Sequence, residues 1–171
     1  GFVTIRDSWS FWNGFLPDTF EPIGDGMGFK LGPTRSYCCG GPDQSDTLLR
    51  VVTRNAAFEN AHGGFDQNGG LTRFEISNNT AFDNGETGFL FGYDAEIDQA
   101  SRNNLSYGNG AAYVGAEIEG DHNTWNGVAE AGDADFASLS SVGVDGPRGV
   151  DGALPTLDFL RLAPDSDLVD A

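Results

Sequence analysis

The sequence has little basic charge and no long apolar run. Its 171 residues include 26 acidic side chains but only nine lysines and arginines together, so the formal net charge is −17. Nucleic acid is excluded as a partner, because too few cations are present to neutralise phosphates. Apolar stretches stay well short of the roughly 18 residues that a membrane-spanning helix requires, so we expect no membrane partner.

Cysteine and lysine are the scarcest reactive residue types. The only cysteines are the adjacent Cys38 and Cys39, which cannot supply a two-pair zinc site and whose state stays open between free thiols and a vicinal disulfide. Lys30 is the only lysine. Unlike arginine, lysine can give up its proton when its surroundings favour the neutral amine. Lys30 is therefore a candidate general base, and the alternative is a surface lysine without a role.

Amphipathic helical patterns are also missing, and a repeat of about 24 residues takes their place. An aromatic residue followed two positions later by Asn recurs in four units, at Phe11 and Asn13, Phe58 and Asn60, Phe82 and Asn84, and Tyr107 and Asn109. Short alternating stretches punctuated by Gly and Asn indicate strands and turns. Stacked units of this kind form a parallel β-helix, an all-β solenoid. We expect the aromatic residues to form an internal stack and the asparagines to form a hydrogen-bonded ladder.

The repeat divides the chain into two parts. Residues 1–127 are predicted to be the coils of the β-helix. From residue 128 the repeat stops, so residues 128–171 are predicted to be an irregular segment of the same domain that caps the open end of the solenoid. Because the sequence starts directly in a strand pattern, we interpret it as a trimmed product or a piece of a longer protein. An N-terminal remainder of that protein is then an expected partner of the coils.

One coil differs from the others. The register of the repeat aligns Phe29 and Lys30 with Phe65 and Asp66, which places Lys30 on the outer surface one coil away from Asp66. The connection that leads to Phe29 spans 18 residues where its equivalent in the next coil spans 7, and the connection that follows spans 29 where the next spans 17. Loops on a rigid scaffold commonly carry function, so we expect these two to wall a cleft over Lys30.

Several polar residues are candidates for contacts in this cleft. The candidate substrate-binding residues are Asp66, Gln67, Asn68 and Arg35. The first three follow the strand next to Lys30, where they are equally well explained as polar turn residues, and Arg35 lies on the second inserted loop. Asp25 stands between Gly24 and Gly26 and is interpreted as a turn former, and the alternative is a ligand.

A lysine base on a long flat β-helix face suits removal of a carbon-bound proton from an extended polymer. Uronic-acid polymers carry such a proton at C5, and β-elimination there needs a base, a cation beside the carboxylate and a leaving group at C4. Calcium is the expected cation, because carboxylates hold it and because it offsets repulsion between an acidic chain and an acidic polysaccharide. A free lysine has a pKa of about 10.4, so the reaction needs alkaline conditions or a neighbouring cation. The carboxylate of Asp66 alone works in the opposite direction.

Three motifs resemble those of a known family. Residues 24–32, GDGMGFKLG, resemble the GDGNGFKLGG signature of the polysaccharide lyase family 9 pectate lyases, with Met27 in place of the usual Asn. Residues 61–68, AHGGFDQN, are similar to the family's GFDQN block, and residues 103–107, NNLSY, are similar to a later coil. The resemblance covers essentially the whole chain. It implies a right-handed parallel β-helix, calcium-dependent cleavage of polygalacturonate by a secreted, extracellular enzyme, and Lys30 as the proton-abstracting base.

One departure from the family leaves two hypotheses open. Members hold the catalytic calcium with aspartates on coils before the lysine coil, and Asp7 and Asp18 do not match that block, so the metal ligands are unknown. The first hypothesis is a calcium-dependent lyase that acts on polygalacturonate or a related pectin. The second is a non-catalytic β-helix that binds acidic polysaccharide or serves as a structural module at a surface.

Overall fold

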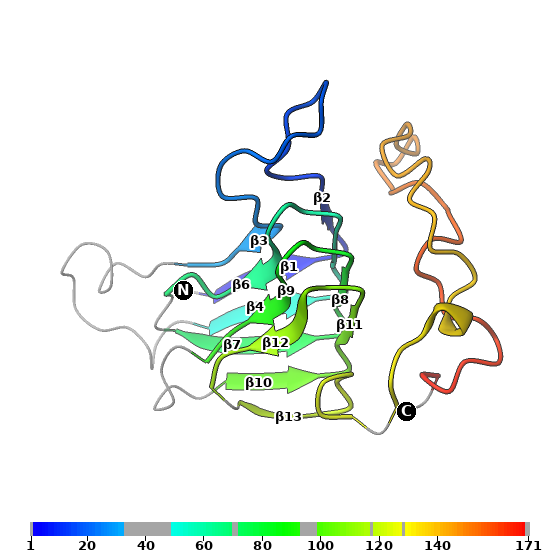
Figure 1. The fold of residues 1–171 in the computed structure, drawn as a ribbon. Coiled ribbons are helices and arrows are strands. Elements are labelled where there is room, and N and C mark those ends of the chain that lie inside the picture. Colours follow the sequence, from blue (N-terminus) through cyan, green and yellow to red (C-terminus); the bar gives the residue numbers. More distant parts are fainter. Residues whose placement is uncertain are drawn as a thin grey trace. The chain divides into compact units, whose positions relative to one another are not determined.

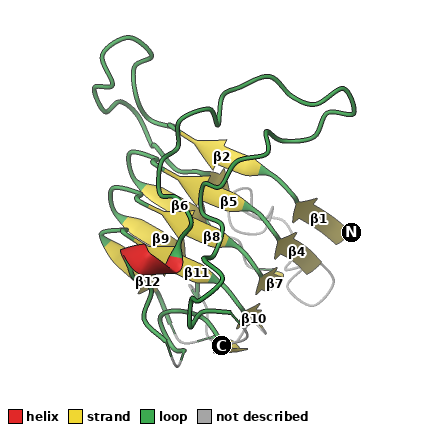
Figure 2. Cartoon of the chain, turned by 90° about the vertical axis from the view of Figure 1, so that its right-hand side faces the viewer, coloured by secondary structure: helices red, strands yellow, loops and turns green. Residues whose placement is uncertain are grey.

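The computed structural model describes residues 2–32, 49–69, 72–92, 99–116, 118–127 and 129–169. The chain forms two compact units, Gly1–Val128 and Ala129–Ala171. In the first unit, parallel strands stack in three columns and the chain winds from one column to the next, which is the architecture of a parallel β-helix (Figures 1 and 2). The predicted all-β solenoid is confirmed.

Each column is one parallel sheet of the described residues. The first sheet has the strand order β1 (Phe2–Arg6), β4 (Leu49–Thr53), β7 (Arg73–Ser77), β10 (Gln99–Arg102), β13 (Glu119–Asp121). The second has the order β2 (Trp9–Phe11), β5 (Ala56–Phe58), β8 (Thr80–Phe82), β11 (Leu105–Tyr107). The third has the order β3 (Phe29–Lys30), β6 (Gly63–Asp66), β9 (Thr87–Leu90), β12 (Ala111–Val114).

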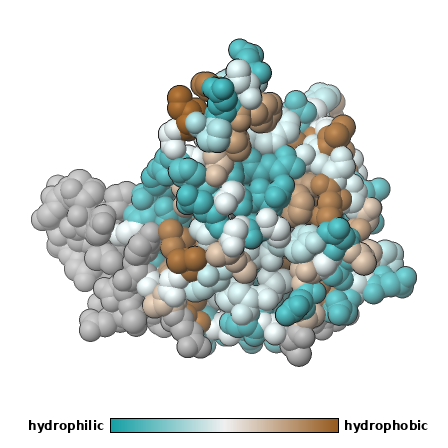
Figure 3. All heavy atoms as spheres, in the orientation of Figure 1, coloured by the Kyte–Doolittle hydropathy of each residue, from teal (hydrophilic) through white to brown (hydrophobic). Residues whose placement is uncertain are grey.

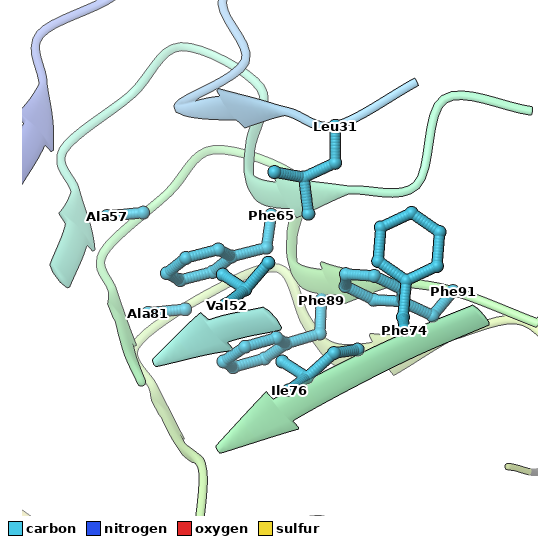
Figure 4. Packing of buried hydrophobic residues seen from close by; sticks show 9 residues of the cluster. All are labelled: Leu31, Val52, Ala57, Phe65, Phe74, Ile76, Ala81, Phe89 and Phe91. Carbon is cyan, nitrogen blue, oxygen red and sulfur yellow. The ribbon is translucent and has the colours of Figure 1, made fainter. Parts of the chain in front are cut away.

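The interior of the coils is filled by apolar side chains from all three sheets. The buried cluster consists of Leu31, Val52, Ala57, Phe65, Phe74, Ile76, Ala81, Phe89 and Phe91 (Figure 4). Successive side chains of a strand point to opposite faces, so every second residue enters this cluster. Phe65 and Phe89 of this cluster and the partly buried Phe29 packed against it form a stack with ring centroids 5.0 Å (Phe29 to Phe65) and 4.9 Å (Phe65 to Phe89) apart and nearly parallel planes. This stack supports the third sheet from inside.

The predicted aromatic column forms in the predicted register, but its predicted place inside the coils was wrong. Its members pair in the order Phe11, Phe58, Phe82 and Tyr107. The rings of Phe11 and Phe58 stack with centroids 5.0 Å apart. The residues before Phe58 and Phe82 in their strands are Ala57 and Ala81, which belong to the internal cluster. Because side chains alternate along a strand, Phe58 and Phe82 lie on the face of the second sheet opposite this cluster, where both are nevertheless buried.

The predicted asparagine ladder is confirmed. The side-chain amide of each asparagine donates to the side-chain oxygen of the next, over 2.7 Å from Asn13 to Asn60, 2.8 Å from Asn60 to Asn84 and 2.8 Å from Asn84 to Asn109. A second ladder runs at the turn between the first and second sheets, through Asn55, Asn79, Asn104 and Asn123. Burial of these amides is tolerated because their hydrogen bonds are made within the ladders and to backbone carbonyls.

The second unit has little regular structure among its described residues. It contains the 3₁₀ turn η1 (Asp133–Asp135) and isolated bridges between Phe136 and Leu162 and between Ser138 and Phe159. Hydrogen bonds donated by the Ser166 hydroxyl at 2.7 Å and by the Gly132 backbone N–H at 2.8 Å lower the pKa of Asp135. The role of residues 128–171 as a cap stays a prediction.

Candidate functional site

Lys30 occupies the outer face of the third sheet. The two-residue strand β3 pairs with β6 so that Phe29 lies beside Phe65 and Lys30 beside Asp66, as the sequence register predicts. Since the ring of Phe29 stacks inward on Phe65, alternation turns the side chain of Lys30 outward. The Lys30 side chain is 42% exposed. The surface around β3 and β6 is largely hydrophilic, with small apolar patches beside it (Figure 3).

Close backbone packing fixes the height of β3 over β6. The Gly28 N–H donates to the Gly63 carbonyl at 2.8 Å, and the Leu31 N–H donates to the Asp66 carbonyl at 2.9 Å. A Cβ atom at Gly28 would lie 2.7 Å from the Gly64 carbonyl oxygen, so only glycine lets the two strands approach this closely. Gly28, which begins the GFK segment, is therefore required for the close packing of the two strands.

The first inserted loop, between β2 and β3, rises above the coils and returns to them just before Lys30 (Figure 1). At its start, the Trp12 indole N–H donates to a carboxylate oxygen of Glu59 at 2.6 Å. Midway, Phe15 and Pro22 form an antiparallel bridge. At its end, the Gly26 carbonyl accepts a hydrogen bond from the His62 backbone N–H at 3.0 Å. The loop is thus tied to the next coil at both ends.

The returning end of this loop brings Asp25 into contact with Lys30. The Asp25 carboxylate accepts a hydrogen bond from the Lys30 ammonium, and the two side chains are 59% and 42% exposed. Sequence reasoning interpreted Asp25 as a turn former, with a ligand role as the alternative, and missed this pairing. The available signal was an acidic residue five positions before the only lysine, within a loop predicted to border it.

The three candidates on the coil after Lys30 differ in how far they reach the surface. Asp66 is 6% exposed, and its carboxylate accepts a hydrogen bond from the Asn68 backbone N–H at 2.6 Å. Gln67 is fully buried, and its side-chain oxygen accepts a hydrogen bond from the Gly92 N–H at 2.8 Å. Its expected contact with a ligand does not fit this geometry, because the amide is used to hold a turn inside the coils. Asn68 is half-buried with a φ of +50° and lies at the edge of the surface.

The remaining basic candidates are distributed differently. Arg35 lies outside the described residues, as do Cys38 and Cys39, so the contact expected of Arg35 stays a prediction. Arg50 is half-buried under the lysine strand, where its guanidinium donates to the Leu31 carbonyl and lies 5.6 Å from the centre of the Phe74 ring. Loss of hydration lowers the pKa of Arg50. This cation fixes the backbone beside Lys30 from within the coils.

Among the described residues, no group of three or more His, Cys, Asp and Glu side chains is arranged to hold a metal ion. Likewise, none of their helices has the length and apolar character needed to cross a membrane.

Comparison with known proteins identifies relatives of this architecture. Residues 1–123 match the family described as Pel9A-like, right handed beta helix region. Pectate lyase PEL9 of Emericella nidulans is 34% identical over 171 residues, which cover 97% of this chain and 39% of that protein. Pectate lyase L of Dickeya chrysanthemi is 33% identical over 173 residues, which cover 99% of this chain and 37% of that protein. The chain therefore spans about two fifths of the length of the curated relatives it matches.

Solved structures give the same picture. The crystal structure of pectate lyase Pel9A superposes with a TM-score of 0.76 at 30% identity, over 97% of this chain and 39% of that one. A rhamnogalacturonan lyase superposes with a TM-score of 0.81 at 27% identity, over 98% of this chain and 44% of that one. Since the family match includes every strand described above, the chain belongs to the Pel9A-like family of right-handed β-helix proteins.

Proposed function

We propose that the protein is a polysaccharide lyase that cleaves polygalacturonate or a related acidic pectin by β-elimination, with Lys30 as the general base. The observation that carries the proposal is the position of Lys30: the only lysine of the chain lies exposed on the outer face of the third sheet. Relatives whose names denote pectate lyases support the substrate class. Because pectin is an extracellular polymer, the protein is secreted in this proposal.

The reaction follows from the chemistry of a neutral amine beside a uronate. The amine nitrogen of Lys30 takes the proton from C5, and the electron pair of that bond forms the double bond between C4 and C5. The glycosidic bond at C4 breaks, and its oxygen leaves with a proton from water. The hydroxide that remains takes up the proton from the Lys30 ammonium, which restores the neutral amine. The products are an unsaturated uronate and a shortened chain with a free hydroxyl. Asn68 and Arg35 are the proposed contacts to the polymer, and Asp66 holds the turn that carries Asn68.

Calcium belongs to the proposal without a site assigned to it. The described residues do not fit the ion, because no cluster of three candidate ligands is present among them, and no step above passes through it. Calcium would reduce the repulsion between a chain of net charge −17 and a polyanionic substrate. Titration of the protein with calcium by calorimetry tests this part separately. Heat of binding supports the cation, and its absence favours the non-catalytic β-helix.

The experiment is an assay of the full-length protein on polygalacturonate with calcium at alkaline pH, in which the unsaturated product is followed by its ultraviolet absorbance. Lys30→Ala and Lys30→Arg should both lower kcat, by between about a hundredfold and ten-thousandfold. Arginine keeps the charge and much of the shape but cannot give up its proton. An active Lys30→Arg protein would remove Lys30 from the role of base. A protein that forms no product but binds the polymer would support the non-catalytic hypothesis.

A second substrate is favoured by one observation. The rhamnogalacturonan lyase superposes with the higher TM-score of the two structures, although its sequence identity is lower. We therefore include rhamnogalacturonan in the same assay. A kcat/KM that is higher on rhamnogalacturonan than on polygalacturonate would reassign the substrate and leave the role of Lys30 unchanged.

A further inference from the structure

We propose that Asp25 is the positioning residue of Lys30, an inference that rests on the function proposed above. The Asp25 carboxylate accepts a hydrogen bond from the Lys30 amine and so holds the amine over the outer face of β3. The contact between the two side chains spans the junction of the inserted loop and the coil. An insertion that only filled space would not need a carboxylate at that point.

The turn that presents Asp25 is built for one conformation. Gly24 and Gly26 flank it with φ values of +74° and +60°, a backbone region that glycine adopts without strain. Gly26 also packs closely on the next coil, since a Cβ atom there would lie 2.8 Å from the Cβ atom of Ala61. Its carbonyl accepts the His62 backbone hydrogen bond described above. The carboxylate of Asp25 is therefore directed at Lys30 by a turn that is fixed to the solenoid.

The charged groups around Lys30 have separate tasks. Asp66 lies beside it in the strand register, buried, and accepts the Asn68 N–H. Arg50 approaches the same strand from inside and donates to the backbone carbonyl after Lys30. The His62 backbone anchors the loop. Asp25 alone of these four reaches Lys30 from the inserted loop, so it can be changed without disturbing the coils.

The hydrogen bond to Asp25 restricts the flexible Lys30 side chain to one orientation, which favours proton transfer. Asn at position 25 keeps the shape and the acceptor oxygen but removes the charge, whereas Ala removes the acceptor as well. The two substitutions therefore separate loss of the charge from loss of the hydrogen bond.

The first test measures kcat and KM separately for Asp25→Asn and Asp25→Ala. Asp25→Asn should change kcat by no more than about twofold, because the acceptor oxygen remains and an exposed ion pair is weak. Asp25→Ala should lower kcat about tenfold through loss of orientation and should leave KM unchanged. Asp18→Asn is the matched control, since Asp18 is an exposed acid on the same loop. A kcat of Asp25→Ala equal to that of this control would overturn the inference.

A second test does not depend on activity. With a single lysine in these 171 residues, protein labelled with ¹³C at the lysine Cε gives one signal from this segment, which Lys30→Arg removes. NMR relaxation of this signal should show a more mobile Lys30 side chain in Asp25→Ala and unchanged mobility in Asp18→Asn. Equal mobility in Asp25→Ala and in the parent protein would overturn the inference even if the enzyme is active. Increased mobility in a protein without lyase activity would support the positioning role and contradict the proposed function.

Discussion

The coil that carries Lys30 and the coil below it begin and end alike but differ in between. Phe11 pairs with Phe58 at one end, and Phe29 pairs with Phe65 at the other. The step along the sequence is 18 positions from Phe11 to Phe29 in the upper coil and 7 positions from Phe58 to Phe65 in the lower coil. The extra residues leave the register of both sheets unchanged. Repeated stacks of side chains thus define the solenoid, and the insertion adds polar groups to it between β2 and β3.

The difference also explains why the insertion is tolerated. Lengthening a surface loop costs little closure entropy, because that cost rises only with the logarithm of loop length. What the insertion has to respect is the close approach at its two ends, where Gly14 and Gly26 touch each other and Ala61. The scaffold below it is unaffected as long as these contacts are kept.

The largest effect is expected where the two coils share their core. Phe65 is fully buried and stacks between Phe29 and Phe89. Phe65→Ala should lower the free energy of unfolding by about 3–5 kcal/mol, measured by chemical denaturation. Phe89→Ala is the control one coil further from the insertion, and its cost should be similar, because the ring packs in the same kind of stack. A cost for Phe65→Ala that is well below that of Phe89→Ala would show that the insertion alters the packing beneath it.

A smaller effect is expected at the turn that belongs to the insertion alone. Gly26→Ala combines a positive φ with a close contact to Ala61, so it should destabilise the protein by about 1–3 kcal/mol. Gly24→Ala has a similar φ but no atom within 4 Å of the added Cβ, and only the backbone term, about 1 kcal/mol, should remain. Thermal unfolding of the two variants measures the difference. Equal losses would mean that the turn moves freely and does not hold Asp25 in place.

Much of the scaffold could be predicted because residues that recur at a fixed spacing determine its strand register. The positions of Phe58, Phe82 and their partners gave the strand register, and the asparagine that follows each of them gave the ladder. A repeat predicts which residues lie beside one another in successive coils. It does not predict which face they occupy, because a stack is possible on either side of a sheet. For that reason the aromatic column was placed inside the coils, although Ala57 and Ala81 fill that position.

The site was predicted only where the repeat reaches it. Lys30 and its neighbour Asp66 follow from the register, since both lie in paired strands. The pairing with Asp25 depends on the path of the inserted loop, which has no counterpart in other coils and so leaves no pattern to align. The burial of Gln67 was missed for a related reason. Its side chain continues the alternation of the strand and turns inward after Asp66, whereas a polar residue just past a strand was expected to lie in an exposed turn.

The smallest effect is expected at an exposed ion pair that joins the same two coils at another turn. Two nitrogens of the Arg54 guanidinium donate hydrogen bonds to the Asp7 carboxylate, Nε at 2.7 Å and Nη2 at 2.9 Å. This hydrogen bonding and the charge of Arg54 lower the pKa of Asp7 in the folded protein. Because the pKa of Asp7 is lower in the folded protein, the pair stabilises the fold at a pH above the unfolded-state pKa of about 4. This contribution is lost as the pH falls through the folded-state pKa of Asp7.

Asp7→Asn should therefore lower Tm by no more than about two degrees at neutral pH. The difference between Asp7→Asn and the parent protein should vanish in acid. A difference that persists when Asp7 is protonated would show that the turn depends on the shape of this residue, so that charge would add nothing to the contact between the inserted and the plain coil.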